Sequence, residues 1–128
     1  MIRIINKIVR VNDFTHIPSC SKKSGAPDDS NSGKLFRESI LLPILKKTEG
    51  VILIDFDGTA GVPNIFIEEA IGDLITVDNY SATELENYLV IKSNEMIEVI
   101  EGVNQIIRER SEIAFEAKFG KVENYCQK

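Results

Sequence analysis

Hydrophobic residues along the chain follow two spacings, one typical of strands and one typical of helices. Residues 2–9 form a β-branched run with partial alternation, which predicts a strand at or near the edge of a sheet. Residues 51–56 are apolar except for Asp55 and lie between turn signals, the pattern of a central strand covered on both faces. Residues 88–92 predict a third, short strand.

Two stretches between these strands have apolar residues at helical spacing. Ser32 is placed to cap the first helix, which is expected to end at Gly50. Pro43 predicts a kink or an early end within it, because proline lacks an amide hydrogen. Pro63 suits the first turn of the second helix. The residues of that helix expected to face the sheet are Ile67, Ala70, Ile71 and Leu74.

The rest of the chain completes a repeating order of strand and helix. Residues 81–84 have the composition of a capping box that opens one or two helical turns, and a last helix is expected from about residue 95 to Gly120. This order predicts an α/β sandwich with a mostly parallel or mixed sheet and helices packed on it. We expect a single domain over residues 1–120, followed by a tail at 121–128.

Residues 11–32 differ from the rest, because turn-forming residues replace large apolar ones. This composition predicts a long loop, with Phe14 and Ile17 as the apolar anchors of its first half. The part at about 18–34 offers little apolar area to offset its backbone entropy, so we expect it to be flexible in the isolated protein. A loop of this length is also a candidate ligand-binding segment.

The charge balance limits the classes of partner. Among 128 residues, 20 are acidic and 15 are basic, which gives a formal net charge of −5. Nucleic acids and anionic membranes attract basic surfaces, so neither is expected as a partner. No apolar run approaches the roughly 20 residues that span a bilayer, and the N-terminus lacks the pattern of a signal peptide. We therefore expect a cytoplasmic protein, and the sequence leaves its oligomeric state open.

Cysteine and histidine are too scarce for a metal centre. Cys20 and Cys126 lie far apart in sequence, and we expect both to be free thiols. His16, the only histidine, is expected at the surface. Residues 32–34 resemble part of a phosphate-binding loop, but Asp28 stands where that motif requires glycine, which argues against nucleotide binding. No metal ion and no cofactor is predicted.

The strongest candidate for enzyme chemistry is Asp55-Phe56-Asp57-Gly58-Thr59, which follows the central strand. This segment resembles the first motif of the haloacid dehalogenase (HAD) phosphatases. The resemblance implies a nucleophile at Asp55, a general acid/base at Asp57 and a magnesium ion held by both carboxylates. That fold needs well over a hundred further residues to complete its site, whereas only 69 residues follow this motif.

The other interpretation of this motif is structural. Asp55 and Asp57 end a strand and begin a turn, and Asp55 is expected to accept hydrogen bonds from turn amides. Gly72, Asp73 and Asp78 imitate the last acidic motif of the phosphatases, but they fall directly after the first motif and are out of order. The structural interpretation is our first choice, and a HAD-like magnesium-dependent phosphatase is the alternative.

A second resemblance extends from residue 12 to about residue 107. Over this range the chain resembles the bacterial STAS-like domain family of unknown function. The family typically has a Phe, a Pro and a Gly before a Ser-Gly-x-x-Phe-Arg motif, a proline in the first helix, a strand followed by Asp-x-Asp-Gly, and a helix with Ser-Phe-x-x-Glu-Ala-x-Gly-x-Leu. This chain lacks the serine of the last motif, since Ile65 precedes Phe66. The residues that carry the resemblance here are Asp13, Phe14, Pro18, Gly25, Ser32, Gly33, Phe36, Arg37, Pro43, Asp55, Asp57, Gly58, Phe66, Glu69, Ala70, Gly72 and Leu74.

The resemblance implies a non-enzymatic regulatory or protein-interaction module. In the related anti-sigma-factor antagonists, a histidine-kinase-like ATPase binds after the central strand and phosphorylates a serine there, which breaks the complex. This chain has Asn64 and Ile65 in that segment and departs from the pattern. The resemblance implies that such an ATPase, or another protein, binds the 57–68 region. The implied partner-binding residues are Gly58, Thr59, Gly61, Val62, Asn64, Ile65 and Glu68.

Helical spacing after Pro63 indicates which residues of this region face outward. It leaves Asn64, Ile65 and Glu68 directed away from the sheet, so Ile65 is expected to be an exposed apolar anchor for a partner. The alternative is that Ile65 belongs to the core.

Overall fold

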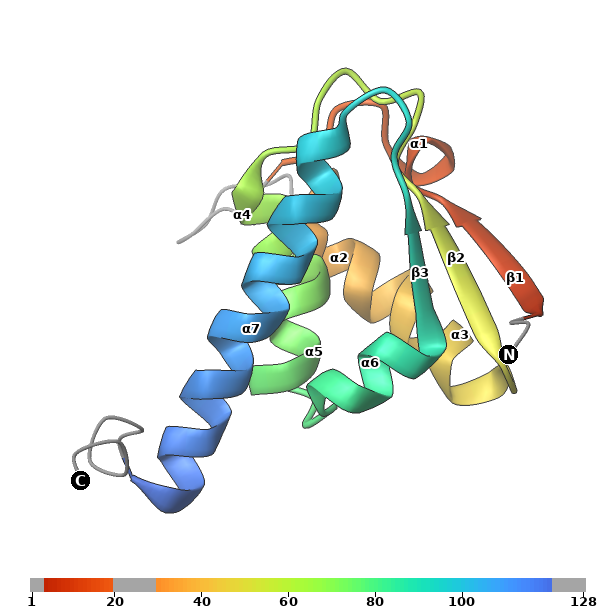
Figure 1. The fold of residues 1–128 in the computed structure, drawn as a ribbon. Helices are drawn as coiled ribbons and strands as arrows, with labels where there is room; N and C mark the ends of the chain where they lie inside the picture. Colours follow the sequence, from red (N-terminus) through yellow and green to blue (C-terminus); the bar gives the residue numbers. More distant parts are fainter. Residues whose placement is uncertain (1–3, 20–29, 121–128) are drawn as a thin grey trace.

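The computed structural model describes residues 4–19 and 30–120 (Figure 1). Its sheet has three parallel strands, β1 (Ile5–Arg10), β2 (Val51–Asp55) and β3 (Leu89–Lys92), in the order β1-β2-β3. The predicted α/β class with a parallel sheet is confirmed. As expected, β1 lies at an edge and β2 in the centre.

Helical segments connect the strands and follow the last one. Between β1 and β2 the helix consists of α2 (Gly33–Phe36), a π-helical turn at Arg37–Leu41 and α3 (Leu42–Lys47). Between β2 and β3 a second helix consists of α4 (Asn64–Ile67), a π-helical turn at Glu68–Gly72 and α5 (Asp73–Thr76). The other described helices are α1 (Val11–Phe14), α6 (Ala82–Tyr88) and α7 (Ile97–Phe119).

The first long helix follows its sequence signals. Ser32 caps it, because its Oγ accepts a hydrogen bond from the Leu35 amide at 3.0 Å. Pro43 is preceded by the π-helical turn, in which the Leu42 amide donates to the Arg37 carbonyl. A wider turn at this point accommodates a residue that cannot donate a hydrogen bond. The predicted kink is therefore a local widening of the helix.

The π-helical turn of the second helix is not predicted by the sequence, since no proline lies within it. Its cause is a contact from the first helix. The Arg37 side chain donates a hydrogen bond from Nε to the Glu69 carbonyl at 2.8 Å, and the Asp73 amide donates to the Glu68 carbonyl instead. A side chain from a neighbouring helix thus takes the acceptor that a regular turn would use.

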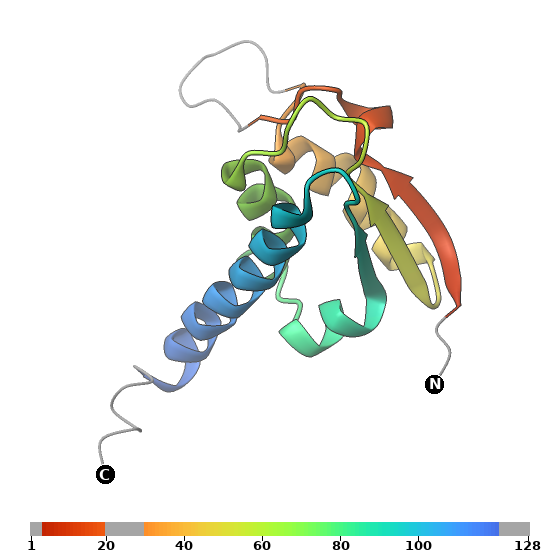
Figure 2. The ribbon, with the colours of Figure 1, turned by 45° about the horizontal axis from the view of Figure 1, so that its top comes forward.

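Helices α2 to α7 lie on one face of the sheet, and the hydrophobic core fills the space between (Figures 1 and 2). Ile52 and Ile54 of β2 are buried in this core. The Phe36 ring packs between Phe14 and Phe66, with ring centroids 5.4 and 5.7 Å away. The residues predicted to face the sheet from the second helix are all buried, namely Ile67, Ala70, Ile71 and Leu74.

The opposite face of the sheet is not covered by α2 to α7 (Figure 2). Strand register aligns Ile8, Leu53 and Val90 across this face, and Ile8 is 47% exposed. Leu53 is partly buried because strands flank it on both sides. The expectation that the central strand is covered on both faces is therefore wrong for the described residues, since a second helical layer is absent there.

The predicted long loop begins differently from the expectation, with the short helix α1. Phe14 packs against the core as predicted, whereas Ile17 is 63% exposed, so its predicted role as an anchor is wrong. Ser19 and Ser32 form a parallel β-bridge that brings the two described ends of the loop together. Most of the 18–34 segment, both cysteines and the 121–128 tail lie outside the described residues.

Across residues 4–19 and 30–120, no helix is both long enough and apolar enough to cross a membrane.

Candidate functional site

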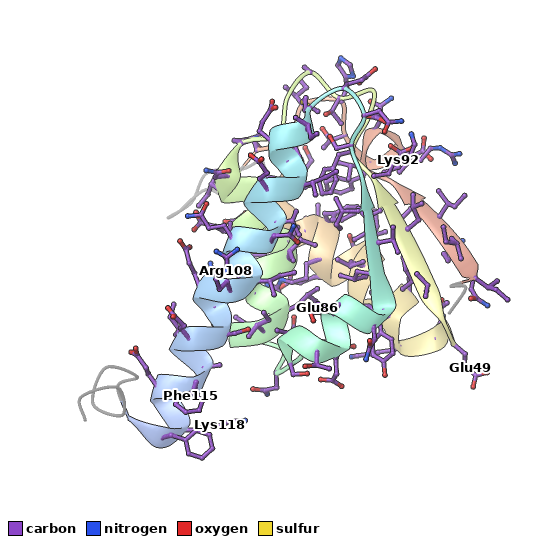
Figure 3. All side chains as sticks on the ribbon, viewed as in Figure 1. Glu49, Glu86, Lys92, Arg108, Phe115 and Lys118 are labelled. Atoms are coloured by element: carbon purple, nitrogen blue, oxygen red, sulfur yellow. The ribbon has the colours of Figure 1, made fainter. Side chains whose placement is uncertain are left out.

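Charged side chains meet at the carboxyl edge of the sheet, where the parallel strands end together. Arg10, Asp55 and Lys92 are the last residues of β1, β2 and β3, and they are in register. The Lys92 Nζ lies 3.5 Å from the Asp55 carboxylate and 2.9 Å from the carboxylate of Asp57 (Figure 3). Arg10 is more distant, with its Nε 4.0 Å from Asp55. We call Asp55, Asp57 and Lys92 the carboxylate cluster.

Asp57 has hydrogen-bond donors on both carboxylate oxygens. Its Oδ1 accepts from the amides of Asn94 and Glu95 at 2.8 and 2.9 Å, and its Oδ2 accepts from Lys92. The Glu95 amide, followed by the ammonium of Lys92, lowers the pKa of Asp57 below its ordinary value of 3.8. The hydrogen bond to Asp57 is also the main cause of the raised pKa of Lys92. At neutral pH both groups are therefore charged.

The turns that follow β2 and β3 are joined in both directions. Asp57 accepts from the Glu95 amide, while the Glu95 carboxylate accepts from the Gly58 amide at 2.8 Å. Gly58 has a φ of 89°, a left-handed conformation that favours glycine. The Ala60 amide donates to the His16 carbonyl at 2.8 Å. Contacts from two other segments, the turn after β3 and the segment at His16, thus fix the chain that leads into α4.

Asp55 has a structural contact of the predicted kind. Its Oδ1 accepts a hydrogen bond from the Asp57 amide at 2.9 Å, so the prediction that it accepts from a turn amide is confirmed. Both carboxylates of the phosphatase-like motif are therefore engaged by groups of the protein itself. Within the two described ranges, no three Asp, Glu, His or Cys side chains are grouped so that they could hold a metal ion.

The second phosphatase-like feature belongs to a different part of the fold. Asp78 lies 2.7 Å from Nη1 of Arg37, and Asp73 lies 2.6 Å from Nη1 of Arg110. We call these four residues the arginine cluster. It joins the helix before β2, the helix after β2 and α7. Asp73 and Asp78 are thus ion-pair partners within the scaffold.

The Ser-Gly-x-x-Phe-Arg motif also has a structural explanation. Ser32 caps the helix, and Gly33 allows it to approach α4 so closely that a Cβ atom would collide with the Phe66 carbonyl oxygen. Phe36 is fully buried, and the side chain of Arg37 is only 4% exposed. Ser32 therefore begins the helix, and Gly33, Phe36 and Arg37 fix its packing against the helix after β2.

Three of the implied partner-binding residues are exposed, namely Gly58, Asn64 and Ile65. The Ile65 side chain points away from the core, with 41% exposure, while its neighbours Phe66 and Ile67 are buried. The predicted outward position of Ile65 is confirmed, and the alternative that it belongs to the core is wrong.

The other four implied residues are partly buried, and three of them also hold the segment in place. The Thr59 hydroxyl donates to a backbone carbonyl at 3.1 Å, Val62 packs against the core, and Glu68 lies 3.7 Å from Arg110. At Gly61 an added Cβ would meet nothing within 4 Å. The structure thus separates the residues that are open to a partner from those that support them.

Sequence analysis gives no role to Lys92, Asn94 or Glu95, although each bonds to Asp57 from 35 to 38 residues away. Lys92 leaves a usable signal, because it ends the third predicted strand and parallel strands end at one edge. Asn94 and Glu95 contribute backbone amides to Asp57, and a backbone contact leaves no signal in the residue types.

Comparison with known proteins gives one family match. Residues 32–96, half of the 128 residues, match the STAS-like domain of unknown function (DUF4325). Neither the curated proteins nor the solved structures provide a significant match. The matched range contains the complete carboxylate cluster and three residues of the arginine cluster, and it ends before α7.

Proposed function

Because the chain belongs to the STAS-like domain family of unknown function, we propose that it is a non-enzymatic interaction module whose partner binds residues 57–68. The observation that carries the proposal is the position of Ile65. It is a large apolar residue with 41% exposure, at the first helical turn after the carboxyl edge. An apolar side chain presented in this way is a typical anchor for a protein partner.

The carboxylate cluster supports this function by holding the segment before Ile65. Asp57, Gly58 and Thr59 each make a hydrogen bond that restrains the turn after β2. A surface that is held in its binding conformation loses less conformational entropy when a partner docks. In this proposal the aspartates of the phosphatase-like motif act on binding through the shape of the turn.

A hollow lined by Asn64, the residue before Ile65, indicates the kind of partner. The hollow has a volume of about 290 Å³ and lies between Asn64 and the start of α7, with Val62 and Ile67 among its apolar residues. Glu98 and Glu101 line its other side. An apolar contact bordered by carboxylates is complementary to a partner with an apolar side chain flanked by lysine or arginine. We propose an ATPase of the histidine-kinase-like class with such a surface as the partner.

The proposal is tested with Ile65→Asp. Burial of one isoleucine in an interface contributes about 1.5–3 kcal/mol, so this substitution should weaken the complex at least tenfold. Val77→Asp is the matched control, because Val77 is 59% exposed at the opposite end of the same helix. Both variants should keep the melting temperature of the wild type within a few degrees. The measurement is the amount of partner that co-purifies with each tagged protein.

Two results would contradict the proposed surface. One is a folded Ile65→Asp protein that retains every partner of the wild type. The other is an equal loss of partners from the Val77→Asp control, which would show that any new charge on this helix disturbs binding.

A magnesium-dependent phosphatase is the second candidate, and the grouping of two carboxylates with Lys92 at the carboxyl edge is the observation that favours it. Asp55→Asn, assayed with magnesium beside the wild type, tests this function. Magnesium-dependent turnover that disappears in the variant would place the phosphatase first. We expect no turnover from either protein, in agreement with an interaction module.

A further inference from the structure

A long groove runs between α7 and α6 on a different side of the molecule from Ile65. Its larger hollow has a volume of about 760 Å³ and is lined by Ala82 and Glu86 on one wall and by residues of α7 on the other. A second hollow of about 280 Å³ shares Ala82, Ser111 and Phe115 with the first and extends along α7 to Phe119. We call this feature the α6–α7 groove.

The outer part of α7 carries large apolar side chains that are exposed to solvent. Ile113, Phe115 and Phe119 are 55%, 42% and 57% exposed, and the helix continues past the body of the domain there (Figures 1 and 2). Phe115 and Phe119, whose ring centroids are 4.8 Å apart, form an apolar patch beside the groove, of the kind that marks a protein interface. Helical spacing places Ile113 on the opposite side of α7, and it lines neither hollow.

Charge around the groove indicates which protein fills it. Arg108 and Lys118 lie along the α7 wall, together with Glu112, and Glu86 lies on α6 (Figure 3). Two cations thus balance two anions on a chain whose net charge is −5. The start of α7, by contrast, presents acidic residues to the hollow near Ile65. Two copies of the chain would repel each other at the acidic end and not at the groove.

We propose that the α6–α7 groove is the interface of a homodimer, in which the outer part of α7 from each copy lies antiparallel in the groove of the other. In a dimer with a twofold axis, every contact occurs twice: if one residue of the first copy touches a second residue of the other copy, the reverse contact is also made. In the antiparallel arrangement Arg108 faces the partner's Glu112, and Glu112 faces the partner's Arg108. A parallel arrangement would place like charges together.

The first experiment measures the oligomeric state by sedimentation equilibrium over a range of concentrations. The wild type should be a dimer, and Phe115→Asp should raise the dimer dissociation constant at least tenfold. Val77→Asp is the control, because it places the same charge on an exposed apolar residue outside the groove. Circular dichroism verifies that each variant is folded. A wild type that stays monomeric at every concentration would overturn the proposal.

The second experiment reverses charges. Arg108→Glu and Glu112→Arg should each weaken the dimer, and the double variant should restore it, because the reciprocal pairs are then re-formed. A dimer insensitive to all three variants would overturn the proposal. So would a dimer that Ile8→Lys disrupts instead, since Ile8 lies on the uncovered face of the sheet. Ile65→Asp should leave the dimer intact, which separates this inference from the proposed partner surface.

Discussion

The arginine cluster and the carboxylate cluster both join segments that are distant in sequence, but Arg37 in the first and Lys92 in the second are exposed to water to different extents. The Arg37 side chain is 4% exposed, whereas the Lys92 side chain is 40% exposed. A buried charge is costly when it loses its partner, while an exposed charge is solvated by water. The first cluster therefore maintains the packing of the helices, and the second positions two turns beside the proposed partner surface.

From this comparison we expect the largest loss of stability when Arg37 is substituted. Arg37→Ala would leave the Asp78 carboxylate, which is 20% exposed, without its closest cation and the Glu69 carbonyl without the Arg37 donor. Loss of one partner from a buried ion pair costs about 3–5 kcal/mol. We expect a decrease of that size in the free energy of unfolding, measured by urea denaturation.

Lys46→Ala is the control for Arg37, since Lys46 is an exposed cation on the same helix. This variant should stay within about 0.5 kcal/mol of the wild type. If Arg37→Ala lost no more stability than Lys46→Ala, water would already solvate the arginine cluster, and the distinction between the clusters would be wrong.

Gly33→Ala tests the same helix contact without removing a charge. A Cβ atom at Gly33 would collide with the Phe66 carbonyl oxygen, which is backbone and cannot rotate away. Overpacking of this kind costs about 1–3 kcal/mol. Gly102→Ala is the matched control, because its added Cβ would lie 3.4 Å from the nearest side-chain atom. The control should be neutral, or more stable by up to about 1 kcal/mol, because alanine favours a helix.

The same contrast explains what the sequence could predict. The cap at Ser32 and the outward position of Ile65 follow from local rules for helix caps and helical spacing, and both expectations agree with the structure. Pro43 predicts a kink or an early end, whereas the helix widens to a π-helical turn before Pro43 and continues to Lys47. The second π-helical turn could not be predicted, because its cause is the Arg37 side chain from another helix. Local residues determine where elements begin and end, but contacts between elements determine their irregularities.

The candidate site shows the same limit. The Asp-x-Asp-Gly motif at the end of β2 resembles a catalytic motif, yet its two aspartates bind Lys92 and the turn amides after β3. The uncovered face of the sheet is also hidden from local patterns, since flanking strands bury the central strand enough to give it a continuous apolar sequence. Only the order of the strands and the placement of the helices show which face of the central strand is covered.

Substitution of Asp57 should have a smaller and more local effect than substitution of Arg37 or Gly33. Asp57→Ala removes the acceptor of the Asn94 and Glu95 amides, whereas Asp57→Asn keeps one carbonyl oxygen for them and loses the charge and the oxygen that accepts from Lys92. Amide hydrogen exchange at these two residues should become faster in the alanine variant and change less in the asparagine variant. Exchange in the core strand β2 should not change. Faster amide hydrogen exchange throughout the domain would show that Asp57, like Arg37, stabilises the whole fold.

The smallest expected effect is a pH dependence of the carboxylate cluster. Folding lowers the pKa of Asp57, chiefly through the Glu95 amide and then through Lys92. Its bonds therefore stabilise the turns fully above the ordinary pKa of 3.8, and this contribution disappears as the pH falls through the lowered value. Folding raises the pKa of Lys92, so the contribution of Lys92 is complete below 10.5 and is lost as the pH rises through the raised value.

The chemical shifts of the Asn94 and Glu95 amides, followed by NMR across the pH range, measure this dependence. They should be constant between these two limits and move on the acid side with a midpoint below 3.8. Asp57→Asn is the control, because it keeps an acceptor oxygen and cannot titrate, so the acid-side movement should vanish. A midpoint at or above 3.8 would mean that the two amides and Lys92 do not hold the charged form of Asp57 in solution. The carboxylate cluster would then not restrain the turn that leads to Ile65.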